Sequence, residues 1–333
     1  MRGNSASNDN GRAFEHACMY TLKSALNAKT SHRPEIDLNY SPHIAAQNAW
    51  NNISDSLRKN LSRAANAAAE YLFKLEPMLD EHGDDPVRLI IQPDTMGEYG
   101  DVRDIVIMRE KREWSIGLSV KHNHFAVKHS RIASDLDFGD RWYKHQCSDE
   151  YWKTVEPIFT RLKGLREKGM QWSELSQEDK WQSIYVPLLT AFKDEIIRQS
   201  KTFYDIPKRM VEYLLGGFDF YKVISIDAQE KTRFQTFNIR GTLNRRSEDR
   251  EPTEKIAVAH LPTKILHFDF KEGSKTTLEM CLNEGWHFTF RIHNGDGRII
   301  PSLKFDVQIK GMPTEIQVID VIWLKEGCVD IPS

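Results

Sequence analysis

The residues best suited to chemistry in this sequence are an aspartate and a lysine within one short stretch. Asp104 lies at the start of an apolar, β-branched run, residues 102–108, and Lys121 directly follows a second run, residues 114–120. The charged segment 109–113 separates the two runs, and this pattern predicts a β-hairpin. In such a hairpin both side chains can point to the same end of the sheet.

This pairing suits the hydrolysis of a phosphodiester. A carboxylate binds Mg²⁺, a hard cation that prefers oxygen ligands. The metal and the lysine ammonium stabilise the negative charge that develops on the phosphate, and the metal lowers the pKa of the attacking water. We therefore predict Asp104 and Lys121 as catalytic residues, Asp104 also as a metal ligand, and Mg²⁺ as the cofactor. A solvated surface hairpin is the alternative, because acidic-x-Lys strings are common.

The elements that must position this hairpin follow from apolar periodicity. Helical spacing predicts a helix over residues 11–27 and an Ala-rich helical stretch over 44–79, broken near residues 51–52. A short strand is predicted at 87–91. After the hairpin, a basic helix is expected at 125–133.

Downstream, the composition and the apolar periodicity of the sequence change twice. The region from Arg141 to about Leu215 is rich in Trp, Leu, Lys and Glu and is predicted to be helical. From Phe218 onward the pattern is typical of strands, with a hairpin turn at 294–297. The predicted strands of this part are 221–226, 233–239, 264–270, 286–292 and 303–309. These patterns predict an α/β (α+β) fold in which a helical insertion precedes a β-rich C-terminal region.

Composition narrows the class of protein. The chain has 333 residues, more than one compact core usually holds, and its 40% hydrophobic and 28% charged residues are typical of a soluble globular protein. A net charge of −2 argues against a general nucleic-acid coating protein but permits a specific enzyme with a local basic cleft. No apolar run reaches the roughly 18 to 20 residues that a membrane span needs.

The cysteines are scattered, which argues against a zinc ribbon or a thioredoxin-like motif. They are Cys18, Cys147, Cys281 and Cys328, and no Cys-x-x-Cys pair occurs among them. A reducing bacterial cytoplasm is the expected compartment.

The hairpin resembles the PD-(D/E)XK nuclease motif. Arg103-Asp104 stands where that motif has Pro-Asp, and the run from Ser119 to Lys121 stands where it has acidic-x-Lys. The resemblance implies a mixed sheet flanked by helices. It also exposes a departure, because Ser119 cannot supply the second metal-binding carboxylate.

That carboxylate must come from elsewhere in the chain, and four candidates remain open. The resemblance implies an acid either from the first helix, which favours Glu15 as a catalytic and metal-binding residue, or from the helix after Lys121, which favours Asp137. Asp101 and Asp135 rank behind them.

Longer stretches resemble the HaeIII restriction endonuclease family and span nearly the whole chain. They are residues 11–15, 119–124, 127–131, 137–142, 290–294 and 301–306. The resemblance implies a type II site-specific deoxyribonuclease that cuts double-stranded DNA at GGCC, as a homodimer or with dimer-like symmetry on DNA. A cognate cytosine methyltransferase is its expected genetic partner. The expected regions are a nuclease core at 1–140, a helical region at 141–217 and a β-rich DNA-recognition region at 218–333.

Several polar residues near the catalytic strand are candidates for DNA binding. Lys128 and Arg131, on the predicted basic helix, would contact phosphates, and His122 and Asn123 would shape the cleft beside the lysine. A solvated helix face or a polar loop is the alternative. The letters of residues 122–124 spell HNH, but three adjacent residues cannot all face one metal ion.

Recognition of bases is expected in the β-rich region. Arg291 is the leading candidate, because arginine donates two hydrogen bonds to guanine. His293, Asn294 and Lys304 are further DNA-binding candidates, and residues 286–295 could form a two-stranded ribbon that enters the major groove. The alternatives to a restriction endonuclease are a DNA-binding protein with a decayed nuclease site and a repair nuclease of the same fold.

Overall fold

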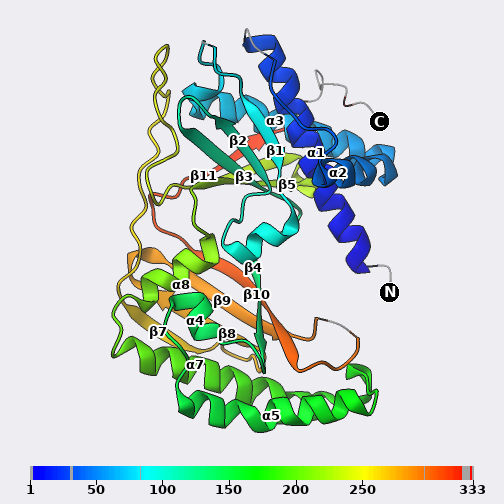
Figure 1. Ribbon diagram of the computed structural model, residues 1–333, viewed down its shortest axis with the longest axis vertical. Coiled ribbons are helices and arrows are strands. Elements are labelled where there is room, and N and C mark those ends of the chain that lie inside the picture. Colours follow the sequence, from blue (N-terminus) through cyan, green and yellow to red (C-terminus); the bar gives the residue numbers. More distant parts are fainter. Residues whose placement is uncertain (1–2, 31–32, 83, 296, 325–330, 332–333) are drawn as a thin grey trace. The chain divides into compact units, whose positions relative to one another are not determined.

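The computed structural model describes residues 3–30, 33–82, 84–295, 297–324 and 331 (Figure 1). Two compact units divide the chain. The first comprises Met1–Phe125, Phe218–Ala259 and Thr314–Ser333, and the second comprises Ala126–Gly217 and His260–Pro313. Each unit is built on its own sheet.

The sheet of the first unit has six strands in the order β1-β2-β3-β5-β6-β11. Their bounds are β1 Arg88–Ile91, β2 Ile105–Arg109, β3 Trp114–His122, β5 Phe220–Ile226, β6 Lys231–Phe237 and β11 Val318–Ile322. β3 and β5 pair in parallel, whereas all the other pairs are antiparallel. This is the mixed sheet that the sequence predicted.

Helices from the start of the chain pack on this sheet. They are α1 Gly3–Lys29, α2 Ser41–Asn52 and α3 Asp55–Leu75, with short 3₁₀ segments at Pro77–Leu79 (η1), Asp94–Tyr99 (η2) and Asp227–Gln229 (η5). α1 lies against β3, and α3 lies against β6. Phe14, Leu22 and Leu72 are buried with Leu118 and Val223 of the sheet in one apolar core. Burial of these side chains fixes α1 beside the β2–β3 hairpin.

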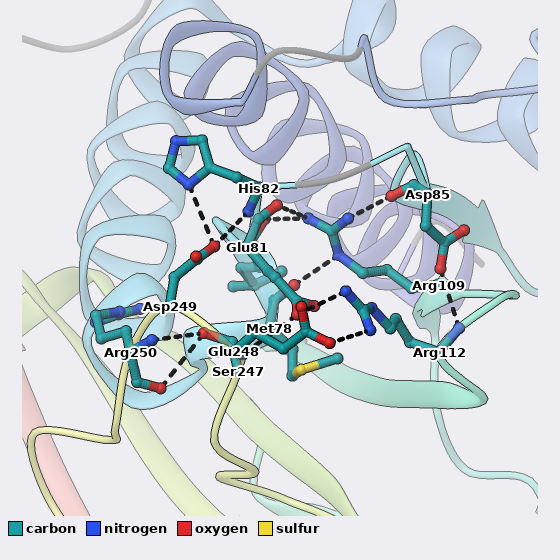
Figure 2. A network of polar contacts seen from close by, with 11 residues as sticks. Met78, Glu81, His82, Asp85, Arg109, Arg112, Ser247, Glu248, Asp249 and Arg250 are labelled. Atoms are coloured by element: carbon teal, nitrogen blue, oxygen red, sulfur yellow. Dashed lines mark hydrogen bonds and ion pairs between the residues drawn. The ribbon is translucent and has the colours of Figure 1, made fainter.

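A buried arginine fastens the β2–β3 hairpin to the segment that follows α3. Figure 2 shows the Arg109 guanidinium among backbone carbonyls of that segment. It donates to the carbonyl oxygens of Met78 at 2.7 Å, Glu81 at 3.0 Å and Leu79 at 3.2 Å, and also to that of Asp85. One side chain therefore satisfies four backbone acceptors that would otherwise be buried without partners.

The second unit contains a five-stranded antiparallel sheet in the order β4-β10-β9-β8-β7. Its strands are β4 Ala126–Ala133, β7 Ile265–Phe270, β8 Thr277–Leu282, β9 His287–His293 and β10 Ser302–Gly311, with a 3₁₀ segment at Asn283–Gly285 (η6). Its helical segments are α4 Phe138–Tyr143, α5 Asp149–Glu167, η3 Trp172–Glu174, α6 Gln177–Lys180, the π-helical η4 Trp181–Tyr185, α7 Val186–Ser200 and α8 Ile206–Leu215.

One face of this sheet is covered by helices, and aromatic side chains fill the contact. Phe290 and Phe305 of the sheet pack against Trp142 of α4 and Phe192 of α7, with ring centroids 4.9 to 6.1 Å apart. Because side chains alternate along a strand, residues between these positions form the opposite, polar face of the sheet.

The sequence predicted most of these elements, and the fold class is confirmed. The basic helix expected at 125–133 is wrong, since that segment is strand β4. The two-stranded ribbon expected at 286–295 is also wrong, because β9 has β10 on one side and β8 on the other. The boundaries of the three expected regions differ from the two units, because β5, β6 and β11 complete the sheet that contains the β2–β3 hairpin.

Among the described residues, no helix is long and apolar enough to cross a membrane. Cys18, Cys147 and Cys281 are free thiols, and Cys328 lies outside the described residues.

Candidate active site

Asp104 and Lys121 come together at one end of the β2–β3 hairpin. The backbone N–H of Asp104 donates to the Leu118 carbonyl at 2.8 Å, which extends the strand pairing to Asp104. Asp104 Oδ2 accepts hydrogen bonds from the Lys121 ammonium at 2.8 Å and from the Val120 amide at 2.6 Å. Both side chains remain partly exposed, at 24% for Asp104 and 27% for Lys121, so a substrate can reach the pair.

Ser119 has a supporting position in this arrangement. Its hydroxyl lies 3.4 Å from Asp104 Oδ2, toward which it donates a weak hydrogen bond, and the residue is buried. Three donors thus hold one oxygen of Asp104. In the described part of the chain no donor is assigned to the other oxygen, Oδ1, which leaves it as an atom that could bind a metal.

Arg103, at the position of the proline in the resembled motif, braces the approach to Asp104. Its guanidinium donates to both carboxylate oxygens of Asp101, at 2.7 and 2.8 Å, and its Cζ lies 3.8 Å from the centre of the Phe218 ring. The aliphatic part of Arg103 crosses Gly117 of β3, which has no side chain to block it. This packing fixes the backbone immediately before Asp104.

Asp101 is occupied by this bracing role. Burial raises the pKa of Asp101, but hydrogen bonds from Arg103 and from the Gln92 amide, at 2.8 Å, outweigh burial and hold that pKa below its ordinary value. Both of its oxygens already accept hydrogen bonds, so we do not include Asp101 among the proposed metal ligands.

Glu15 lies within electrostatic reach of the catalytic pair. Burial raises the pKa of Glu15 well above its ordinary value, and the negative charge of Asp104 raises it further, whereas the ammonium of Lys121 opposes both. The helix that carries Glu15, α1, packs directly against β3. The expectation that the first helix lies against the hairpin is therefore confirmed.

A third carboxylate near the site, Asp94, was missed at the level of sequence. Asp94 forms an ion pair with Arg12 of α1 at 2.7 Å, and its charge raises the pKa values of both Glu15 and Lys121. The sequence signal was weak, because Asp94 is an exposed residue in the segment that connects two strands. That segment lies at the same end of the sheet as Asp104.

A buried lysine, Lys222 of β5, stands beside the catalytic strand and was also missed. It pairs in register with Ser119, and its ammonium donates to the Phe125 carbonyl at 2.8 Å. Burial lowers the pKa of Lys222 to about 7, helped by the positive charge of Lys121 and opposed by Asp104. A lysine in an apolar run carries no sequence signal that it is buried.

Lys121, the predicted catalytic lysine, stays charged. Burial lowers the pKa of Lys121, but the carboxylate of Asp104 more than compensates, with smaller contributions from Glu15 and Asp94, so that this pKa is above its ordinary value. Lys121 is therefore an ammonium that can stabilise negative charge on a phosphate.

His122 and Asn123 belong to an internal network. His122 Nε2 lies 3.1 Å from Asp227 Oδ2, and the Asn123 side-chain oxygen accepts from the Asp227 amide at 3.1 Å. The Asn123 amide donates to the Ser225 carbonyl at 2.9 Å, with φ at +51°. These contacts fix the turn after Lys121. The structure therefore supports a positioning role for His122 and Asn123, which were expected to bind DNA.

Asp137 and Asp135 were candidates because a helix was expected after Lys121, but this segment forms strand β4. Asp137 instead caps the N-terminus of α4. It accepts hydrogen bonds from the amide of Asp140 at 3.0 Å and from that of Cys147 at 3.1 Å. Asp135 is exposed in the preceding turn. Neither carries over into the proposed metal site.

The donor set around Asp104 fits Mg²⁺. Within the described ranges no three His, Cys, Asp or Glu side chains gather as a ready metal cluster. Mg²⁺ usually keeps several waters and binds one or two carboxylates, which Asp104 and Glu15 can supply. A divalent cation between them would also relieve the repulsion that raises the pKa of Glu15.

Four predicted DNA-binding residues share the polar face of the second unit's sheet. Lys304 of β10 stands opposite Arg131 of β4 on one side and opposite His293 of β9 on the other. Arg291 lies two residues along β9 and is 58% exposed. The sheet therefore gathers basic side chains on one surface, although they are far apart in sequence.

The structure gives less support to a DNA-binding role for two other predicted residues. Lys128 lies in β4, but its side chain falls outside the described residues. Asn294 follows β9 in the turn toward β10, and its carbonyl lies 2.9 Å from His293 Nδ1.

A mixed sheet flanked by helices, with an aspartate and a lysine paired on a hairpin, defines a nuclease-like α+β protein. A family model described as HaeIII restriction endonuclease matches residues 11–313, and the chain belongs to that family. The chain is 43% identical over 318 residues to the type II restriction enzyme HaeIII of Haemophilus aegyptius, an alignment that covers 95% of this chain and 98% of that protein. No solved structure matches the chain.

Proposed function

We propose that this chain is a Mg²⁺-dependent type II restriction endonuclease that cuts double-stranded DNA at GGCC. The observation that supports this most directly is the ion pair of Asp104 and Lys121 on the β2–β3 hairpin, in a chain that belongs to the HaeIII family. Ser119 lacks a carboxylate, and Glu15 from α1 replaces it.

The residues of the site divide the work of phosphodiester hydrolysis. Asp104 and Glu15 would hold Mg²⁺, which when bound lowers the pKa of water and stabilises charge on the phosphate. Val120 and Ser119 keep Asp104 oriented. When a phosphate binds, the Lys121 ammonium would move partly away from Asp104 and donate to a phosphoryl oxygen. Its positive charge there would stabilise the transition state.

The polar face of the second unit would bind the duplex. Arg131, Lys304 and His293 form one row across three strands and would contact phosphates. Arg291 in the next row is the proposed base-reading residue, because arginine can donate to both O6 and N7 of guanine. Catalysis and recognition would thus be carried by different units of the chain.

The remaining biological expectations follow from this function. GGCC reads the same on both strands, so a homodimer with one active site for each strand would match its symmetry. A cognate cytosine methyltransferase would keep the enzyme from cutting its host's DNA, and the bacterial cytoplasm is where both would act.

Cleavage assays on the Asp104→Ala and Lys121→Ala variants test the proposal. Each should lower the cleavage rate of a GGCC duplex in Mg²⁺ about a hundredfold or more, since each removes a group that acts on charge in the transition state. Both should still prefer the GGCC duplex when binding is measured in Ca²⁺. Lys111→Ala, which alters an exposed lysine next to the same hairpin, is the control.

The outcomes separate the possible functions. Loss of cleavage with retained specific binding supports the proposed site. Near-normal cleavage by either variant would refute the assignment of these residues. Specific binding by the wild-type protein without any metal-dependent cleavage would indicate a DNA-binding protein with a decayed site.

A further inference from the structure

Arg291 and Asp306 form an ion pair on the polar face of the second unit's sheet. They stand directly opposite each other on β9 and β10, and Arg291 Nη2 donates to Asp306 Oδ2 at 3.1 Å. The two members differ in exposure, since the arginine is 58% exposed and the aspartate only 8%. Among the described residues the guanidinium uses one nitrogen, for this contact, and its other donors are available to a ligand.

The aspartate is held but incompletely paired. Gln308 Nε2 also donates to Asp306 Oδ2, at 3.3 Å, so both donors reach the same oxygen. Asp306 Oδ1 is buried and accepts no hydrogen bond in the described part of the chain. A buried acceptor without a donor is costly, and such groups usually have a partner in the working state of a protein.

A G·C base pair presents the complementary pattern in the major groove. Guanine offers the acceptors N7 and O6, and the paired cytosine offers the donor N4 directly beside them. A guanidinium and a carboxylate tied side by side present donors and then an acceptor in the same order. An A·T pair keeps the N7 acceptor but places the adenine N6 donor where guanine has O6, and the thymine O4 acceptor at the carboxylate, so one hydrogen bond of the arginine and the contact of the carboxylate would be lost.

We propose that Arg291 and Asp306 act as one reading unit for a single G·C pair of the target site. Arg291 moves toward the guanine and donates to its O6 and N7. This movement uncovers the buried carboxylate of Asp306, which then accepts a hydrogen bond from the N4 amino group of the paired cytosine. This inference rests on the proposed function, since it assumes a duplex on the polar face. It adds a cytosine-reading role for Asp306, which otherwise would only orient the arginine.

Base analogues test each half of the reading unit separately. The measurement is binding in Ca²⁺ to a GGCC duplex, to duplexes with 7-deazaguanine at one guanine, and to duplexes with pyrimidin-2-one, which lacks the 4-amino group, at one cytosine. For each analogue, substitution at one of the possible positions in the site should lower the affinity of the wild-type protein by about tenfold. Asp306→Ala should show no further loss with pyrimidin-2-one at that position, and Arg291→Ala should show none with 7-deazaguanine at the paired guanine.

Controls separate base reading from damage to the sheet. Asp306→Asn keeps the size of the side chain, and Glu279→Gln alters another carboxylate on the neighbouring strand β8. Thermal unfolding and affinity for a scrambled duplex report whether each variant folds. Glu279→Gln should remain as sensitive to both analogues as the wild-type protein.

Failure of this inference differs from failure of the proposed function. If Asp306→Ala and Asp306→Asn lose as much affinity as the wild-type protein when pyrimidin-2-one replaces either cytosine, Asp306 does not read cytosine and the reading unit is wrong. A wild-type protein that binds GGCC no better than a scrambled duplex would overturn the proposed function together with this inference.

Discussion

Gly117 and Arg103 lie so close that a methyl group on the glycine would stand 1.9 Å from Arg103 Cδ. Arg103 cannot move aside easily, because Asp101 holds its guanidinium and Phe218 covers it. The glycine in the middle of β3 therefore makes room for the arginine that precedes the catalytic aspartate.

Gly117→Ala should lower the free energy of unfolding by about 1 to 3 kcal/mol, the usual cost of overpacking a buried site. Because the displaced arginine adjoins Asp104, the cleavage rate should fall as well. Thermal unfolding and cleavage measured on one preparation check both effects. Gly164→Ala is a matched control, because nothing lies within 4 Å of its added methyl group in α5, and it should stabilise slightly. An unchanged unfolding temperature for Gly117→Ala would contradict the packing described for Arg103.

Arg109→Lys should destabilise the protein by about 3 kcal/mol or more. A lysine ammonium cannot reach the four carbonyls that the guanidinium serves, so buried acceptors would lose their donors (Figure 2). Chemical denaturation gives the change in the free energy of unfolding. Lys111→Ala, which removes an exposed ion pair with Asp84, should change it by less than about 0.5 kcal/mol. Equal stability of the two variants would show that Arg109 is not a structural anchor.

Glu76 should make the stability of the first unit depend on pH. Its carboxylate is fully buried and accepts hydrogen bonds from Tyr221 Oη at 2.5 Å and from the Asn244 amide at 2.6 Å. Burial raises the pKa of Glu76 to about 7, although these hydrogen bonds oppose the shift. The folded state thus retains a proton that the unfolded chain has already lost, and this contribution is complete below the unfolded pKa.

Between about pH 4.5 and 7, Glu76 alone should lower the free energy of unfolding by about 1.4 kcal/mol for each pH unit as the pH rises. In Glu76→Gln, which cannot titrate, this slope should disappear. Urea denaturation at several pH values measures it. If the wild-type protein and the variant showed the same pH dependence, the carboxylate would be ionised in the folded protein throughout this range.

The local patterns around Asp104 were sufficient to predict that it lies beside Lys121. The alternation in residues 102–108 and 114–120 fixed a hairpin, and hairpin geometry then brought Asp104 to Lys121. The helical stripe of the first helix likewise placed Glu15 near a buried face. Each of these relations depends on residues close in sequence or on one amphipathic face.

Relations between distant segments could not be predicted in this way. Residues 126–133 are rich in charge but pair with β10, about 170 residues later, so the partner strand and not local propensity made them a strand. The burial of Lys222 depends on the parallel pairing of β3 and β5 across an intervening unit. Without knowledge of these pairings, the lysine looks exposed and the basic segment looks helical.

Lys222→Met should impair cleavage without weakening specific binding. The variant removes the anchor on the Phe125 carbonyl and a polar group beside Ser119, both of which support the catalytic strand. Single-turnover cleavage in Mg²⁺ should slow about ten- to a hundredfold, as for other residues that orient metal ligands, while affinity for GGCC in Ca²⁺ stays the same. Lys59→Met, an exposed position on α3, should change neither quantity. Wild-type cleavage by Lys222→Met would show that its position beside the catalytic strand has no functional consequence.

Lys304→Ala should weaken binding to every DNA sequence by a similar factor. Lys304 occupies the centre of the row formed with Arg131 and His293, and a row of basic side chains along a DNA backbone contacts phosphates rather than bases. Loss of one phosphate contact should reduce the slope of log affinity against log salt by about one. Titrations of GGCC and scrambled duplexes at several salt concentrations in Ca²⁺ measure both quantities, with the exposed Lys201 after α7 replaced by Ala as the control. A loss of affinity confined to the GGCC duplex, with an unchanged salt slope, would instead place Lys304 against a base edge. Only Arg131 and His293 would then remain as proposed phosphate contacts in this row.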